Sequence, residues 1–138
     1  MAFQWKERYK LGIPEIDMQH KKLFEIGNRA YDIAMSDYDY DRYDDIMSII
    51  YELLEYTKYH FNYEEKLMEK YGYTGIDSQK TEHNFYIDKI SNISPSAIDD
   101  DQEKAILDIL GFLSQWISTH ILFSDRKYVD EFKQKGIL

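Results

Sequence analysis

The chain has 138 residues, which is the length of a single domain with a core of its own, and we expect residues 1–138 to form one domain. Its formal charge of −9 argues against nucleic acid and anionic membranes as partners, and its lack of cysteine excludes disulfides, iron–sulfur clusters and thiolate-bound zinc. No apolar run approaches the roughly 18 residues of a membrane-spanning helix and the first residues lack a signal-peptide core, so a soluble cytoplasmic protein is expected.

Apolar residues recur at helical spacing along most of the chain, and turn-forming residues divide this pattern into helices. After an N-terminal arm that ends at Pro14, Asp17 is expected to cap a first helix over residues 17–37. The polar stretch 36–41 is predicted to connect it to the longest helix, at about 41–71. The inward face of this second helix is predicted to comprise Ile46, Ile50, Leu53, Thr57, His60, Glu64, Leu67 and Tyr71.

Two further helices and a short tail follow. Asp77 is expected to cap the third helix, which ends before Pro95. The fourth opens in the acidic run 99–101, where negative charge favours a helix N-terminus. Helices joined by such short links predict an all-α fold, an up-down-up-down antiparallel four-helix bundle with an N-terminal arm and a short C-terminal helix in the tail 126–138.

The chain contains four histidines, and each predicted helix carries one of them on its apolar face: His20, His60, His83 and His120. A single histidine in such a position is more often a hydrogen-bonded core residue than a ligand. Burying four unrelated imidazoles, however, would cost a small core several desolvation penalties. A metal site removes that cost, because the imidazoles then serve as ligands.

Two carboxylates strengthen this interpretation. Glu64 lies four residues after His60 and therefore points from the same face of its helix, whereas Glu65 lies off that face and is expected to be solvated. Asp125 follows His120 by five residues, a rotation of about 140° on an ideal helix. Both can reach one site only if the helix ends or loosens near residues 122–124. Otherwise Asp125 is a solvated charge or a cap for the tail helix.

Imidazole and carboxylate ligands suit iron, zinc or manganese and do not choose among them. Ligands from all four helices suggest two metal ions, as in other carboxylate sites within bundles.

The same residues resemble the hemerythrins, particularly the single-domain bacterial kind. The resemblance covers nearly the whole chain and is carried by residues 12–20, by 60–65, by the pair Glu82–His83 and by 116–121 leading to Asp125. It implies two non-heme iron ions that bind dioxygen, in a carrier, store or sensor. By analogy His20 and His60 would serve one iron and His83 and His120 the other. Glu64, Asp125 and an oxo or hydroxo group would bridge them.

One position departs from the family pattern of two histidines four residues apart on the third helix. Here the first of them is Gln79, with the spacing to His83 preserved. A glutamine oxygen is a weaker ligand than imidazole, so Gln79 ligates poorly, leaves its place to water, or hydrogen-bonds a bound water or oxidant. An open position would favour a di-iron enzyme that reduces peroxide or dioxygen over a reversible oxygen carrier.

Three classes of function therefore stay open: an oxygen-binding protein, a di-iron enzyme that needs an electron donor, and a structural bundle with incidental metal. Trp116, Ile117 and Ile121 flank His120 and could wall an oxygen pocket or simply pack the core. Tyr86 is a candidate redox-active tyrosine. The physiological oxidant or anion, any protein partner and the oligomeric state are not indicated by the sequence.

Overall fold

The computed structural model describes residues 4–36 and 41–138. Residues 1–3 and 37–40 lie outside the described residues, and with them the predicted end of the first helix and most of the predicted connection to the second. The described residues contain no strand, which confirms the all-α class.

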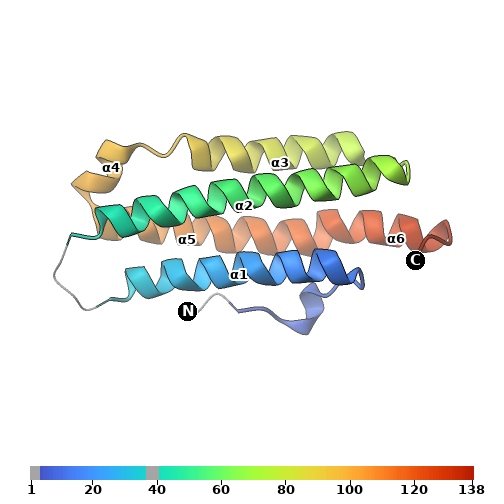
Figure 1. Cartoon of the computed structure of the whole chain (residues 1–138), viewed down its shortest axis with the longest axis horizontal. Helices are drawn as coiled ribbons and strands as arrows, with labels where there is room; N and C mark the ends of the chain where they lie inside the picture. The colour runs from blue at the N-terminus through green and yellow to red at the C-terminus, as the bar shows by residue number, and fades with distance from the viewer. Residues whose placement is uncertain (1–3, 37–40) are drawn as a thin grey trace.

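Long helical segments run antiparallel to one another, up and down the molecule (Figure 1). They are α1 (Pro14–Ala34), α2 (Tyr43–Lys70), α3 (Ile76–Ser91) and α5 (Gln102–Thr119), the last continued by η2 (His120–Asp125) and α6 (Arg126–Gln134). A short η1 (Glu7–Tyr9) lies in the N-terminal arm, and α4 (Pro95–Asp100) lies between α3 and α5. The predicted antiparallel four-helix bundle is confirmed.

The first helix begins earlier than predicted, and Asp17 is not its cap. Pro14 occupies the first position of α1, where its missing N–H costs nothing. Asp17 lies inside the first turn and accepts hydrogen bonds from the backbone N–H groups of Leu11 (2.8 Å) and Gly12 (3.1 Å). Its carboxylate therefore fastens the N-terminal arm to the bundle.

The other helix starts follow local rules with one correction. Gly75, not Asp77, precedes α3, and Asp77 lies in the first turn of that helix. Asp101, the last residue of the acidic run, caps α5 by accepting from the N–H of Lys104. Ser94 caps α4 in the same way.

The last helix loosens near residues 122–124, which is the condition under which His120 and Asp125 can reach one site. Residues His120–Asp125 form a π-helix, in which the hydrogen bonds span five residues instead of four. The predicted tail helix is not a separate element: α6 continues α5 through η2 without a break. The continuous helix Gln102–Gln134 contains an 18-residue window of mean hydropathy 1.4, long and apolar enough to cross a membrane, contrary to expectation. Its apolar side chains Ile106, Leu113 and Ile117 are buried in the bundle, and 33% of that window is buried in all.

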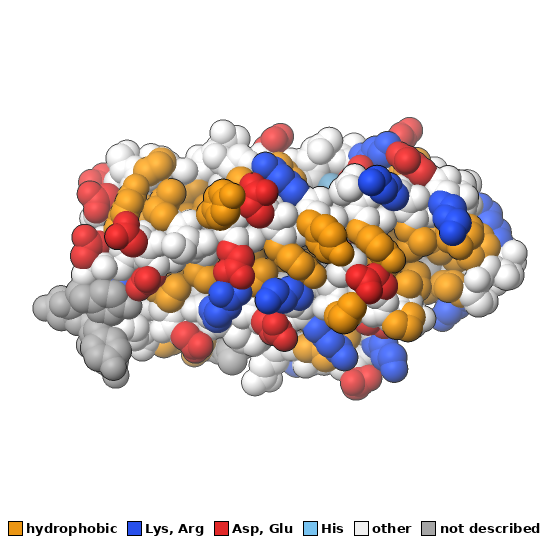
Figure 2. All heavy atoms as spheres, viewed as in Figure 1, with side chains coloured by type: hydrophobic (Ala, Val, Ile, Leu, Met, Phe, Trp, Pro, Cys, Tyr) orange, Lys and Arg blue, Asp and Glu red, His pale blue; other side chains and the backbone are white. Residues whose placement is uncertain are grey.

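The core lies along the bundle axis, and on one face of the surface acidic and basic side chains alternate with apolar ones (Figure 2). The residues predicted to face inward on α2 are buried from Ile46 as far as Glu64. The prediction is wrong for the last two of them. Leu67 and Tyr71 are only partly buried, and Met68 is fully buried in their place. A straight helix drifts relative to a repeat of seven residues, which moves the buried face by one position over seven turns.

Candidate metal centre

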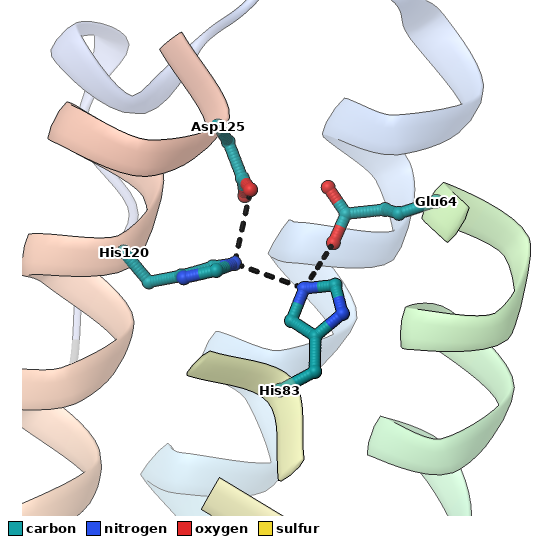
Figure 3. Close-up of side chains that lie close together, drawn as sticks. All are labelled: Glu64, His83, His120 and Asp125. Carbon is teal, nitrogen blue, oxygen red and sulfur yellow. Dashed lines mark hydrogen bonds and ion pairs between the residues drawn. The ribbon is translucent and has the colours of Figure 1, made fainter. Parts of the chain in front are cut away.

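All seven residues predicted for the site lie inside the bundle, and none is more than 3% exposed. Each of the four helices of the bundle supplies at least one of them. His20 comes from α1, His60 and Glu64 from α2, Gln79 and His83 from α3, and His120 and Asp125 from η2, which continues α5. Figure 3 shows Glu64, His83, His120 and Asp125 reaching toward one another from three of these segments.

Glu64 lies at the middle of the cluster. Its Oε1 is 2.9 Å from His60 Nε2 and 3.6 Å from His83 Nε2. Its Oε2 is 3.9 Å from His20 Nε2. The carboxylate thus faces imidazoles from α1, α2 and α3 at once.

Asp125 faces the cluster from the opposite side, and the π-helix puts it there. One extra residue in the turn returns the side chain five positions after His120 to the face of His120. Asp125 Oδ1 is 3.0 Å from His120 Nε2, and Oδ2 is 3.2 Å from His20 Nε2. The carboxylate therefore spans imidazoles of the first and last helices.

Several buried nitrogen and oxygen atoms of the cluster lack a hydrogen-bond partner. The Nε2 atoms of His83 and His120 are 3.1 Å apart. Buried polar atoms of the cluster that lack a hydrogen bond of normal geometry are His20 Nδ1, His20 Nε2, Glu64 Oε1, Gln79 Oε1, His120 Nδ1 and Asp125 Oδ2. Unpaired buried polar groups are costly, and cations remove that cost. The residues present therefore fit a metal.

Two sets of potential ligand atoms each lie within 4.8 Å of one another. One set is Glu64, His83, His120 and Asp125, and the other is His20, His60 and Glu64. Glu64 belongs to both, so the geometry is suited to two ions that share a carboxylate.

A layer of polar side chains outside the cluster fixes the imidazoles. Gln19 Oε1 lies 2.6 Å from His60 Nδ1, and Gln19 is itself held by Glu15 (2.9 Å). Glu65 Oε2 lies 2.8 Å from His83 Nδ1, so the prediction that Glu65 is solvated is wrong. Because Nδ1 donates to these oxygens, Nε2 carries the lone pair that points inward, as a metal-binding histidine requires.

His120 and Glu64 have outer partners of their own. Glu82 Oε1 is 3.6 Å from His120 Nδ1 and also accepts a hydrogen bond from the Ser124 hydroxyl (2.6 Å). The buried Tyr128 hydroxyl donates to Glu64 Oε2 (2.8 Å). Tyr128 lies in the tail 126–138, where no site residue was predicted. Its position three residues after Asp125, on the same helical face, is the signal that could have found it.

Electrostatics divide the cluster into unlike halves. Burial lowers the pKa of His60 to about 4 and also lowers that of His83. Burial and the charge of Asp125 raise the pKa of Glu64 to about 7. Burial alone would lower the pKa of His120, but the charge and hydrogen bond of Asp125 outweigh it and raise that pKa to about 10. For Asp125, His120 likewise overcomes burial and holds the carboxyl pKa well below its usual range.

Gln79 enters the cluster through its amide nitrogen. Nε2 donates to Asp125 Oδ1 (3.1 Å), while the amide oxygen is buried without a hydrogen bond. Gln79 thus supports the second carboxylate and leaves one oxygen atom available. This contact with Asp125 was not anticipated from the sequence.

Aromatic rings pack against two of the imidazoles. Phe61 stacks on His83 with ring centroids 4.0 Å apart and planes at 5°, and Trp116 stacks on His120 at 4.4 Å and 12°. Ile117 and Ile121 are buried core residues. Whether they also wall an oxygen pocket stays a prediction.

The chain is similar to proteins of known families. Residues 11–132 match the family described as "Hemerythrin HHE cation binding domain". The chain is 43% identical over 128 residues to a bacteriohemerythrin of Clostridium acetobutylicum, covering 93% of this chain and 99% of the relative. It is 33% identical to a bacteriohemerythrin of Pseudomonas aeruginosa, covering 91% of this chain and 78% of the relative. It is 30% identical to a hemerythrin-like protein of Naegleria gruberi, covering 99% of this chain and 93% of the relative.

Proposed function

Because this chain belongs to the hemerythrin family, we propose that it holds two non-heme iron ions in the buried cluster and binds dioxygen there. In this proposal residues 1–138 act as one cytoplasmic domain. The observation that carries the proposal is that four imidazole Nε2 atoms and two carboxylates from separate helices converge in the core. Several of their buried atoms lack a hydrogen bond. Iron supplies the electrons for reversible oxygen binding, which these side chains cannot.

The chain's own residues set the ligand arrangement. By analogy with the family, His20 and His60 would hold one ion, and His83 and His120 the other, in keeping with the two sets of neighbouring ligand atoms that share Glu64. Glu64 and Asp125 would bridge, together with an oxo or hydroxo group. Gln19 and Glu65 keep the Nε2 lone pairs of His60 and His83 directed inward, and the sealed core excludes bulk water.

Metal analysis followed by anaerobic reduction and exposure to oxygen tests the proposal. We expect about two iron ions per chain and a visible absorption band that appears with oxygen and disappears when oxygen is removed. The absence of iron, or a spectrum insensitive to oxygen, would contradict it.

A pair of variants tests whether Glu64 bridges. In Glu64→Ala the two cations would repel each other without the central carboxylate, so we expect iron loading to collapse. Glu55→Ala removes an exposed glutamate from the same helix and should load like the wild type. Two ions retained in Glu64→Ala would show that Glu64 does not bridge.

The alternative function, reduction of peroxide or dioxygen, is favoured by one observation, the amide at position 79. Gln79 uses its nitrogen on Asp125 and so offers at most a weak oxygen ligand to the His83/His120 ion. This leaves an exchangeable position there. Replacement Gln79→His should close it, slowing autoxidation and weakening azide binding. Equal autoxidation rates and azide affinities in wild type and variant would eliminate the open position.

A further inference from the structure

The cluster is sealed, because each of its predicted ligands is at most 3% exposed. A molecule that donates electrons to oxidised metal inside the bundle cannot touch it directly. Electrons must therefore cross intervening side chains, and the efficiency of that crossing falls steeply with distance. Aromatic rings that contact the imidazoles can bridge part of that distance.

Of the two rings stacked flat on imidazoles among the described residues, only one leads outward. Phe61 on His83 is 4% exposed and is enclosed by the core. Trp116 on His120 is only partly buried. Its ring lines a surface hollow of about 320 Å³ together with Phe85, Phe112, Gln115 and Thr119.

The chemistry of the rings also selects Trp116. An indole loses an electron far more readily than the benzene ring of phenylalanine, and it can keep its N–H proton while doing so. Tyr86 packs on Trp116 with centroids 4.7 Å apart, but burial raises the pKa of its phenol well above its usual value. The Thr57 hydroxyl beside it is no base, so Tyr86 has nowhere to send the proton that phenol oxidation releases.

We infer that Trp116 is an oxidisable relay between the metal pair and the surface hollow, and that it lets this protein oxidise small phenols with peroxide. The inference rests on the proposed function, since it requires iron at His120. Peroxide breaks its O–O bond by taking up two electrons and two protons, giving two waters. The electrons leave Trp116 one at a time through His120.

Each indole radical cation is then restored by one phenol in the hollow, which gives up one electron and one proton. The sum is one peroxide and two phenols converted to two waters and two phenoxyl radicals. The hollow fits this donor because Phe85, Phe112 and Trp116 offer ring faces and Gln115 and Thr119 offer hydrogen bonds.

The fate of the two tryptophans gives a test that does not depend on turnover. Iron-loaded protein is treated with excess peroxide without phenol, then digested and examined by mass spectrometry. We expect oxygen addition at Trp116 and an indole radical signal in freeze-quenched samples. Trp5, which packs on Phe24 and Tyr9 and has no recorded ring contact with an imidazole among the described residues, should be spared and serves as the internal control. Metal-free protein should show neither effect, and added phenol should protect Trp116.

Variants separate the relay from its surroundings. Trp116→Phe keeps a stacked ring but not an oxidisable one, so peroxide-driven phenol oxidation should fall by about tenfold or more. Trp5→Phe should oxidise phenol like the wild type, and both should load iron equally.

Because the chain has no cysteine, Thr119→Cys can be alkylated uniquely with a bulky maleimide. That block should stop phenol oxidation while peroxide still oxidises Trp116.

The opposite results overturn the inference. Wild-type phenol oxidation by Trp116→Phe, or equal oxidation of both tryptophans in iron-loaded protein, would exclude the relay and leave the proposed function intact. If Trp116→Phe fails to load iron, unhindered phenol oxidation in the alkylated Thr119→Cys protein excludes the hollow. A wild-type chain that holds no iron refutes the proposed function and this inference together.

Discussion

At the scale of single residues, two imidazoles of the same buried cluster, His60 and His120, differ in their protonation before metal binds. His60 is surrounded by the core and by Gln19, so burial keeps it neutral. His120 faces Asp125, whose charge keeps the imidazole protonated in the metal-free protein. A metal ion entering at His120 must therefore displace a proton, whereas His60 presents a free lone pair.

Nitrogen-15 NMR of the histidine rings in the metal-free protein can check this difference. With pKa values of about 4 for His60 and about 10 for His120, His60 should be neutral at pH 6 and His120 doubly protonated at pH 8. Of these two imidazoles, only His120 competes for a proton with the metal between pH 4 and pH 10, and Glu64, with its pKa of about 7, adds to the competition in the lower half of that range. A neutral His120 at pH 8 would contradict the assignment.

Tyr128 provides a second residue-scale prediction. At pH 8 Glu64 is mostly ionised, so the Tyr128 hydroxyl donates to a charged acceptor in a buried site. Tyr128→Phe should lower the free energy of unfolding of the metal-free protein by about 2 kcal/mol in urea. Tyr73→Phe is the control, because the ring of Tyr73 neighbours that of Tyr128 with centroids 6.0 Å apart. Loss of its hydroxyl should lower the free energy of unfolding clearly less. Equal losses in the two variants would remove any special role for the bond to Glu64.

At the scale of elements, the π-helix decides whether Asp125 reaches the cluster. Deleting the exposed Phe123 would restore ordinary α-helical bonding and leave His120 and the aspartate four residues apart, still on one face. Inserting an alanine after Phe123 would rotate the aspartate by about 100°.

We therefore expect the deletion to retain iron and the insertion to lose it, with helix content measured by circular dichroism similar in both. The deletion is the matched control, since it changes the same turn by the same amount in the opposite sense. Full iron loading in the insertion variant would show that Asp125 is not needed in its present orientation.

The helices, and the inward direction of the candidate ligands, were predictable because they depend on periodicity within one helix. The steps of three and four placed His60 and Glu64 on one face, and the step of five required a loosened turn before Asp125. The outer partners were not predictable from single helices. Glu65 was assigned to solvent because it lies off the apolar face of α2, yet α3 packs close enough for His83 to reach it. Gln19 and Gln79 likewise gain their partners only when neighbouring helices dock.

At the scale of the molecule, the cluster is a stability liability until cations fill it. Buried atoms of His20, Glu64, His120 and Asp125 lack good hydrogen bonds in the protein alone. Removing metal with a chelator should lower the melting temperature on the order of 10 °C, because metal binds the native state and weakly, if at all, the unfolded chain. Glu64→Ala, which should not load metal, is the control, and a chelator should leave its melting temperature unchanged. An unchanged wild-type melting temperature would exclude a structural role for metal.

Each helical segment contributes one imidazole to the cluster, and this sets the order of events when the chain folds. His60 with Glu64, and His120 with Asp125, are neighbours within their own helices and can form before the bundle does. His20 and His83 join only when α1 and α3 have docked. A single helix before docking is therefore at best a weak chelator with two ligands. Tight capture of iron marks the completion of folding, so the rate of iron uptake by a refolding chain reports the last docking step.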